Sequence, residues 1–245
     1  MKENQNKAIK NKSISVIIPA LNEEKNLEVT TKMVRQAVEK RFDEYEVFIY
    51  DDGSTDNTGI IANRIARNDN HFKVIQHKKP KCIGKIYKEG VKLAKMNYVI
   101  LINGKCDINQ YELDKIFKLV GTADMIIPYT LNLKERAFAR IVISKIFASI
   151  LNILFGLKLK YYNHFVLHKR EIINSINIKT DSYAFQAEAL IKLIKKGYSY
   201  IEIGIVDRFE KGIKTKAFSF QNVFLVLVFF VIIIFEIYFK KRKNF

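Results

Sequence analysis

Three groups of polar and charged residues in the first half of the chain carry side chains that suit a charged ligand. They are Pro19-Ala20-Leu21-Asn22-Glu23, Asp51-Asp52-Gly53-Ser54 and Asn103-Gly104-Lys105-Cys106-Asp107. In the second group, the glycine and the residues after it suit a turn that caps the next helix. Such a turn does not account for the two adjacent carboxylates. An ionised carboxylate at the end of a buried strand needs a partner, for instance a ribose hydroxyl, a base N–H or a cation.

The pattern around these groups predicts the elements that position them. Short apolar runs predict buried strands at Ser13–Pro19, Glu46–Tyr50, Phe72–Gln76, Tyr98–Ile102 and Met125–Pro128. Amphipathic stretches between them predict helices, the first with Leu27, Thr30, Val34, Ala37 and Val38 on one face, and the others over Thr58–Arg67, Gly84–Lys95 and Gln110–Val120. This alternation indicates a mostly parallel sheet covered by helices on both faces. Ligands of such sheets bind outside the carboxyl ends of the strands, so we expect the three groups to meet there.

The composition narrows the class of protein. With 49% hydrophobic and 27% charged residues the chain is globular, which excludes a collagen-like or wholly disordered protein. Its 42 Lys and Arg against 25 Asp and Glu give a charge of +17, which favours anionic partners such as nucleic acid, acidic lipid or phosphorylated substrates. A lysine-rich composition throughout is the alternative explanation. Only two cysteines are present, which excludes a disulfide framework and a four-cysteine zinc site.

The two ends of the chain differ from the rest. Residues 1–12 are polar and basic, and we expect a flexible tail there. Residues 217–239 are strongly apolar, about the length that spans a bilayer, and a basic tail follows at 240–245. We therefore expect a membrane protein with a single C-terminal transmembrane helix and its globular part on the cytoplasmic side. A buried helix of the globular domain, or tight association without spanning, is the alternative.

The first two motifs together resemble a known family. A strand that ends in Pro-Ala-Leu-Asn-Glu, followed about thirty residues later by a strand that leads into Asp-Asp-Gly-Ser-Thr-Asp-Asn-Thr, is similar to the GT-A glycosyltransferases of sequence family 2. Among them it resembles the dolichyl- and undecaprenyl-phosphate sugar transferases. Further similar stretches are Gly84-Lys85, Phe185–Glu188, Ile201–Ile205 and Arg208–Lys216, although the last has one residue too many between Arg208 and Gly212.

The resemblance implies both fold and activity. It covers residues 13–216 and implies a GT-A domain, which is Rossmann-like with a mostly parallel sheet. The implied activity is inverting transfer of a single sugar from a nucleoside-diphosphate sugar to a membrane acceptor, a polyprenyl phosphate. A relative that glycosylates another glycan or lipid acceptor is the enzymatic alternative. The implied donor site consists of Pro19, Leu21, Asn22, Glu23, Asp51, Asp52, Ser54, Lys85 and Asn103.

The third group departs from the family pattern. The family places an Asp-x-Asp there, which holds Mg or Mn on the donor diphosphate. This chain has Asp107 as the sole carboxylate, with Lys105 where a metal ligand is expected. Three interpretations stay open: Asp107 and Asn103 hold a metal weakly, Lys105 replaces the metal, or the site is inactive and the protein is a scaffold. We take Asp107 and Lys105 as the catalytic candidates and Asp107 as a weak metal ligand.

The acceptor side is predicted in the second half of the chain. Residues 134–158 form an amphipathic stretch expected to lie at a membrane interface. The resemblance implies that Arg136, Arg140 and Ser144 hold the acceptor phosphate, with Arg208 and Lys216 closing the site. A lipid phosphate is already ionised near neutral pH and needs no strong base. A sugar hydroxyl would need one, and His164 is the nearest candidate.

Several partners are excluded or left open. The chain has no Trp, so the Gln-x-x-Arg-Trp motif of processive polysaccharide synthases is absent. The aromatic residues lie in apolar runs rather than among basic residues, so no nucleic-acid partner is expected. A partner membrane protein or a homo-oligomer remains open.

Overall fold

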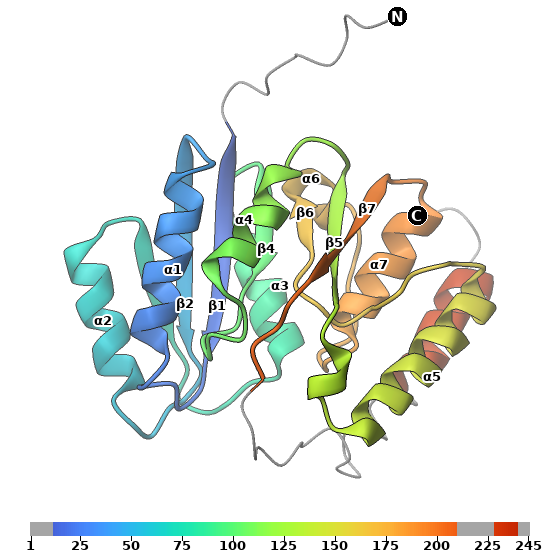
Figure 1. Ribbon diagram of the computed structural model, residues 1–245, viewed down its shortest axis with the longest axis horizontal. Coiled ribbons are helices and arrows are strands. Elements are labelled where there is room, and N and C mark those ends of the chain that lie inside the picture. Colours follow the sequence, from blue (N-terminus) through green and yellow to red (C-terminus); the bar gives the residue numbers. More distant parts are fainter. Residues whose placement is uncertain (1–11, 210–227, 240–245) are drawn as a thin grey trace, which may run out of the picture.

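The computed structural model describes residues 12–209 and 228–239 and has one seven-stranded sheet between layers of helices (Figure 1). The strands are β1 (Ser13–Ala20), β2 (Glu44–Asp51), β3 (Phe72–Gln76), β4 (Tyr98–Leu101), β5 (Met125–Thr130), β6 (Leu167–Lys169) and β7 (Tyr200–Ile205). Their order in the sheet is β3-β2-β1-β4-β6-β5-β7. All neighbouring pairs are parallel except those of β6, which runs antiparallel to β4 and β5. The sheet is therefore mostly parallel, as the sequence predicts.

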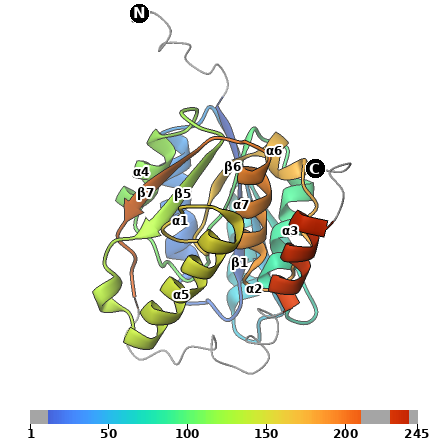
Figure 2. The same cartoon turned by 90° about the vertical axis from the view of Figure 1, so that its right-hand side faces the viewer.

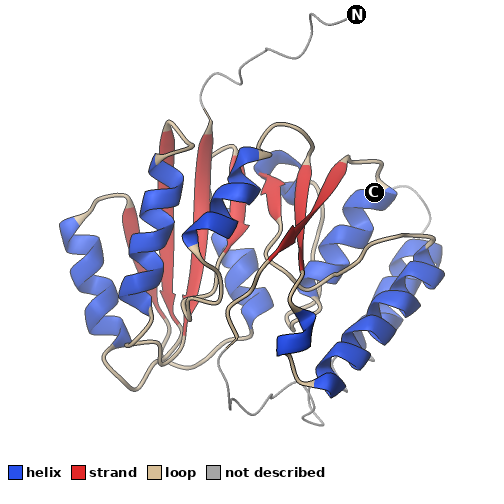
Figure 3. Ribbon diagram, in the orientation of Figure 1, coloured by secondary structure: helices blue, strands red, loops and turns tan. Residues whose placement is uncertain are grey.

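Helices cover both faces of the sheet (Figure 3). One layer consists of α1 (Leu27–Glu39), α2 (Thr58–Asn68) and α4 (Gln110–Lys118). The other consists of α3 (Ile83–Leu93), α5 (Phe138–Phe155), α6 (Arg170–Asn174) and α7 (Phe185–Lys195). Strand residues serve the two layers alternately: Ile14, Val16 and Ile18 pack under the first layer, and Ile17 packs under the second. The central strands are buried on both sides, which explains their continuous apolar runs.

The predicted elements agree with the observed ones. All five predicted strands are present, with ends that differ by at most two residues, and the five residues assigned to one face of α1 are all buried. The sequence patterns miss β6 and α6. Strand β6 has three residues, one of them the fully buried His168, so it leaves no apolar run to detect.

The segment predicted as an interfacial helix begins later and ends earlier than 134–158. A short 3-10 helix, Leu133–Glu135, comes first, and α5 follows from Phe138. Gly156 ends α5 with φ of +60°, a left-handed conformation that glycine adopts without strain. Of the described helices, α5 alone is long and apolar enough to cross a membrane, and only 17% of that stretch is buried.

The C-terminal helix, Val228–Phe239, packs against the globular domain instead of standing apart from it. Phe229 and Ile233 are almost fully buried in the same core cluster as α5 and α7. Each buried side chain of this size stabilises the packing by roughly 2 kcal/mol. The described part of the predicted anchor is therefore buried against the domain on one side and exposed on the other, where Val231, Phe235 and Phe239 lie. Residues 217–227 of that prediction, the tails at 1–11 and 240–245 and the candidate Lys216 lie outside the described residues.

Candidate active site

The three predicted groups meet at one edge of the sheet. Asp51 pairs with Ala20 at the carboxyl ends of the parallel strands β1 and β2. The backbone N–H of Asp52 donates to the Ala20 carbonyl at 2.9 Å, and that of Gly104 donates to the Pro19 carbonyl at 3.0 Å. The expectation that the three loops converge is therefore confirmed, and each loop is positioned by the end of a buried strand.

The first and second loops are hydrogen-bonded to each other. The backbone N–H of Asn22 donates to Ser54 Oγ at 3.0 Å, and Asn22 Oδ1 accepts from the Thr55 N–H at 2.8 Å. The Glu23 N–H donates to Thr58 Oγ1 at 2.8 Å. Asn22 has φ of +57°, a conformation that asparagine tolerates better than most residues. Asn22 and Ser54, both predicted to contact the donor, thus also hold the shape of the site.

The two adjacent carboxylates point to different partners within the protein. Asp51 Oδ1 accepts from the Ser54 N–H at 3.1 Å, and its Oδ2 accepts from Gln76 Nε2 at 3.1 Å. Asp52 Oδ1 lies 2.8 Å from His77 Nδ1, and both its oxygens accept from the Lys81 N–H, at 2.9 and 3.0 Å. The partners that the sequence argument sought in a ligand are therefore supplied by the chain itself.

His77 connects Asp52 to a second carboxylate. Its Nε2 lies 3.2 Å from Glu89 Oε2, and Lys81 Nζ lies 2.8 Å from Glu89 Oε1. Burial opposes the ionisation of Glu89, but the Lys81 ammonium and His77 outweigh it and hold the pKa of Glu89 below its usual value. Both ring nitrogens of His77 therefore face carboxylates, Asp52 on one side and Glu89 on the other. The sequence analysis missed this group, because its members come from three segments without a recognisable motif.

The third loop carries Lys105 and Asp107. Asp107 Oδ2 accepts from Asn103 Nδ2 at 2.9 Å and lies 3.2 Å from Lys105 Nζ. Asp107 Oδ1 is buried and, within the described part of the chain, lacks a hydrogen-bond partner. Cys106 between them has φ of +57°, which is uncommon for a residue with a side chain. The loop is held by β7's continuation, where the Arg208 N–H donates to the Asp107 carbonyl at 2.9 Å.

This loop does not fit a divalent cation held by the protein alone. Mg²⁺ takes about six oxygen ligands, and Asp107 Oδ1, which is buried, is the single unpaired carboxylate oxygen of this loop. Across residues 12–209 and 228–239, no group of three or more His, Cys, Asp or Glu side chains is arranged to hold a metal. The Lys105 ammonium instead supplies a positive charge beside Asp107, with half of its side chain exposed.

Lys85, the remaining donor candidate, lies on the first turn of α3. Its Nζ is 3.7 Å from Asp181 Oδ2, and Lys88 Nζ is 2.5 Å from Asp181 Oδ1. The Gly84 N–H donates to the Asp181 carbonyl at 3.0 Å, and a Cβ at Gly84 would come within 2.6 Å of that oxygen. Glycine is therefore required at this contact, which braces the start of α3, and Lys85 is half exposed beside it.

The predicted acceptor residues do not form one cradle. Arg136 Nη1 donates to the Tyr161 hydroxyl at 3.0 Å, and its guanidinium lies 5.1 Å from the centre of the Phe209 ring. Arg208, next in the chain, has its Nη1 3.6 Å from Cys106 Sγ. Arg136 and Arg208 therefore meet at the segment that follows β7, beside the third loop. Farther along α5, Arg140 is exposed, and Ser144 Oγ donates to the Ile141 carbonyl of its own helix.

His164, the candidate base, is locked in place. Its Nδ1 accepts from the Phe165 N–H at 2.9 Å, so its Nε2 carries the proton and donates to Asp207 Oδ1 at 3.0 Å. Thr130 donates to the other oxygen of Asp207 at 2.5 Å. Burial opposes ionisation of Asp207, but these two contacts keep its pKa below the usual value. His164 therefore has no nitrogen free to accept a proton, and it joins the ends of β5 and β7 instead.

Comparison with known proteins agrees with this arrangement. A family model described as glycosyl transferase family 2 matches residues 15–129, the stretch that contains all three loops. The chain is thus similar to the family 2 glycosyltransferases over this stretch, which is just under half of its length. It is 25% identical over 203 residues to the polyprenol monophosphomannose synthase of Mycolicibacterium smegmatis, which covers 78% of this chain and 75% of that protein. It is also 25% identical over 111 residues to glycosyltransferase GlyG of Streptococcus pneumoniae serotype 4, covering 45% of this chain but only 36% of GlyG.

Solved structures show the same fold. Glucosyl-3-phosphoglycerate synthase of Mycobacterium tuberculosis in complex with Mn²⁺, UDP and phosphoglyceric acid superposes with a TM-score of 0.67 at 18% identity, covering 89% of this chain and 78% of that one. Its complex with Mg²⁺ and UDP gives 0.64 at 17% identity, with 89% and 79% covered. At this identity the likeness supports the GT-A fold of this glycosyltransferase and leaves its ligands undetermined.

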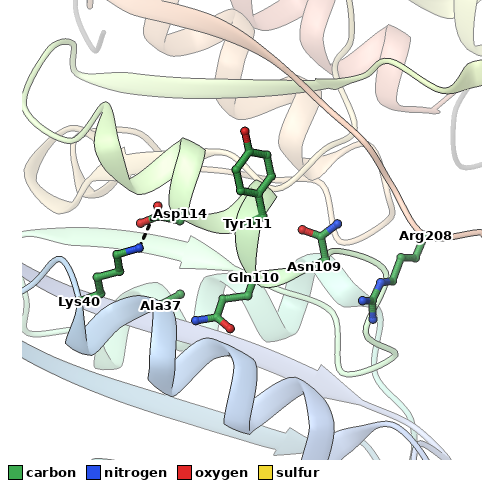
Figure 4. Close-up of a pocket in the computed structure, with 7 residues that line it drawn as sticks. All are labelled: Ala37, Lys40, Asn109, Gln110, Tyr111, Asp114 and Arg208. Carbon is green, nitrogen blue, oxygen red and sulfur yellow. Dashed lines mark hydrogen bonds and ion pairs between the residues drawn. The ribbon is translucent and has the colours of Figure 1, made fainter.

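A groove beside the site of this glycosyltransferase lies between α1 and α4 (Figure 4). It encloses about 480 Å³ and is lined by Ala37, Lys40, Asn109, Gln110, Tyr111, Asp114 and Arg208. Asp114 is held there by Arg41, whose Nε donates at 2.6 Å and whose Nη2 donates at 3.0 Å. Arg208 thus has one side on this groove and the other on the third loop.

Proposed function

We propose that this glycosyltransferase moves a single sugar, with inversion, from a nucleoside-diphosphate sugar to a polyprenyl phosphate at a membrane surface. The observation that carries the proposal is the meeting of the three loops at the carboxyl edge of the sheet, where they bring two adjacent carboxylates and Lys105 to the same edge. The similarity to a polyprenol monophosphomannose synthase over three quarters of that protein's length supports the acceptor class.

The donor base and ribose would lie against the first two loops. Asp52 receives two donors from the chain, His77 and the Lys81 N–H. A carboxylate has about four lone-pair sites, so Asp52 keeps capacity for the N–H of a base edge. Leu21, on the first loop, is 41% exposed and would supply an apolar contact for the base.

The donor diphosphate would lie toward the third loop. Two phosphates depart with the nucleotide, and the negative charge that develops on them must be offset. Lys105 on this loop and Lys85 on the first turn of α3 are half-exposed cations that could meet these phosphates. Because the loop does not fit a protein-held metal, we propose that the Lys105 ammonium supplies this stabilisation and that Asp107 fixes its position.

The reaction then needs no general base. An ionised phosphate oxygen of the lipid attacks the anomeric carbon, the bond from that carbon to the diphosphate breaks, and the nucleoside diphosphate leaves with the electron pair. A phosphate monoester is largely ionised above its second pKa of about 6. Both ring nitrogens of His164 are held in hydrogen bonds within the protein, which supports an acceptor that is already ionised and needs no base.

The acceptor would arrive along α5. This helix exposes most of its apolar surface, and Arg136 and Arg140 lie near its start. Arginine binds phosphate oxygens through paired hydrogen bonds, and a helix of this kind lies in the headgroup region with its cations at phosphate level. Arg136, at the rim beside Phe209, is the phosphate ligand we favour.

Incubation of membranes containing the protein with a panel of radiolabelled sugar nucleotides tests the proposal. We expect label from one donor to become extractable into organic solvent, and Asp52→Asn to reduce it at least tenfold. Thermal unfolding of the Asp52→Asn chain controls for loss of fold. If the label enters only water-soluble or glycan products, the acceptor is not a lipid phosphate. If no nucleoside diphosphate raises the unfolding temperature of the protein, the protein is an inactive scaffold.

A further inference from the structure

More than half of the large apolar side chains left exposed in the described residues lie on two helices at one end of the molecule. On α5, Phe138 and Ile153 are 79% and 82% exposed. On the C-terminal helix, Val231, Phe235 and Phe239 are 70%, 59% and 69% exposed. Exposed apolar residues elsewhere are scattered singly over several elements, which is normal for a soluble surface.

The two helices lie side by side and run in the same direction. Phe147 of α5 contacts Phe229 and Phe230, with ring centres 6.2 and 5.8 Å apart. Farther along both helices, Phe155 stacks on Tyr238 with ring centres 6.0 Å apart, and the Tyr238 hydroxyl donates to the carbonyl of Leu154. Both helices face the viewer in Figure 2. Their exposed sides therefore form one continuous apolar face, called here the two-helix face.

A buried charge cluster fixes the C-terminal helix to the catalytic domain. Glu236 is 8% exposed at its side chain and forms ion pairs with Lys179, at 2.5 Å, and with Lys192. Lys192 also pairs with Glu188 of α7 at 2.5 Å. Burial opposes ionisation of Glu236, but the two lysines outweigh it and keep its pKa below the usual value.

The direction in which Glu236 points determines which side of the C-terminal helix can contact lipid. A carboxylate in an apolar helix is costly in lipid, but here it points into the protein, away from the exposed Phe235 and Phe239. The described helix is about 18 Å long at 1.5 Å per residue, short of the ~30 Å of a bilayer core. Its geometry thus suits a helix that is bound to the protein on one side and to lipid on the other.

We propose that the two-helix face docks flat on the surface of an anionic bilayer, in one leaflet, with Glu236 holding the C-terminal helix in place. Exposed cations on α5, Arg140 and Lys145, and the overall charge of +17 complement acidic headgroups. The proposal rests on the proposed membrane acceptor, and it gives that acceptor a route: the face ends near Arg136, at the rim of the site.

Depth-dependent fluorescence quenching tests the orientation, because the chain has no Trp of its own. Single substitutions Ile153→Trp, Val231→Trp and Tyr238→Trp each place a probe on the two-helix face, and Ile60→Trp, 70% exposed on α2, is the control. Vesicles of phosphatidylcholine and phosphatidylglycerol carry bromine at a shallow or a deep acyl position. We expect the three face probes to be quenched more by shallow than by deep bromine, and the control by neither.

Two patterns would overturn the proposal. Deep quenching of Val231→Trp with shallow quenching of Tyr238→Trp would mean that the C-terminal helix crosses the bilayer. No quenching of any face probe, together with dimers in sedimentation, would mean that a second copy covers the face. The thermal shift with nucleoside diphosphates, measured on the same chains, reports the donor site separately, so a failed donor site and a failed docking face are distinguishable.

The role of Glu236 has its own test. We expect Glu236→Gln to speed hydrogen exchange in residues 228–239 at least tenfold and to weaken vesicle binding about fivefold, because half of the face is no longer held. Glu171→Gln, an exposed carboxylate on α6, is the matched control and should change neither. Unchanged exchange in Glu236→Gln would refute the holding role even if the vesicles still bind.

Discussion

Lys105 is the residue on which the proposed chemistry of the third loop depends. Its ammonium lies 3.2 Å from the sole carboxylate of that loop, where a metal-dependent relative needs a second acidic side chain. An ammonium and a divalent ion both offset phosphate charge, but the lysine is covalently attached and cannot be removed by a chelator. Treatment with a chelator therefore distinguishes a mechanism that uses Lys105 from one that uses a metal ion.

We expect Lys105→Ala to lower kcat about a hundredfold or more, since removal of one group that stabilises a leaving charge typically costs that much. EDTA should leave the activity of the natural chain largely intact. Lys118→Ala, a half-exposed lysine on α4, serves as control. Activity that disappears with EDTA and returns with Mg²⁺ or Mn²⁺ would instead support the weak metal site at Asp107.

Single residues could be predicted only as far as their motifs reach. The donor loops were found because polar residues follow apolar strand runs, and they meet as predicted. The partners of Asp52 were not found, since His77 and Lys81 lie about twenty-five to thirty residues away and belong to no motif. Likewise, the residue that holds the candidate base His164 in place is Asp207, forty-three residues farther along the chain, and no motif connects the two.

At the scale of elements, contacts between segments decide what sequence patterns leave open. An apolar run looks the same whether lipid or a protein core covers it, so residues 217–239 could be predicted as an anchor. The lysines that bind Glu236 come from α7 and the loop before it, and no local pattern connects them. Strand β6 was missed because three residues carry too little periodicity.

The link between α1 and α4 gives a prediction about acid stability. The hydrogen bonds from Arg41 to Asp114 outweigh burial and lower the pKa of Asp114 from 3.8 to about 2. Since the folded pKa is the lower one, the pair stabilises the fold above about pH 4 and loses this contribution as the pH falls toward 2. Allowing for the partly exposed Arg41, we expect Asp114→Asn to cost about 1–2 kcal/mol at pH 7.

Urea unfolding of the natural chain and of Asp114→Asn at several pH values measures this difference. The gap between the two chains should narrow steadily below pH 4, whereas Glu44→Gln, an exposed carboxylate at the start of β2, should show almost no gap at pH 7. A gap that stays constant down to pH 2 would show that Asp114 acts through packing and not through its charge.

At the scale of the whole molecule, the three loops and the two-helix face are connected through the same sheet. The loops lie at the carboxyl edge of the sheet, and α5 starts from the end of β5 at the same edge. Since β6 runs antiparallel, its first residues return to this edge and bring His164 beside Asp207. The reversal of one short strand therefore joins the half of the sheet that carries the three loops to the half from which α5 starts.

The excess positive charge predicts how the molecule finds its surface. We expect binding to phosphatidylglycerol vesicles to weaken strongly between about 0.05 and 0.3 M salt, since screening shortens the reach of exposed charges. The remaining affinity should be insensitive to salt, because it comes from the apolar two-helix face. Co-sedimentation with charged and neutral vesicles measures both parts. Equal binding to neutral vesicles at all salt concentrations would mean that the charge plays no role.

The hydrogen bonds between Asn22, Ser54 and Thr55 have a consequence for selectivity. Because hydrogen bonds within the chain join the first two loops, we expect little conformational entropy to be lost when the proposed nucleotide donor binds. We expect such a preformed site to change its shape little on binding. An unsuitable sugar nucleotide would then be rejected because it dissociates fast, and not because it reacts slowly once bound.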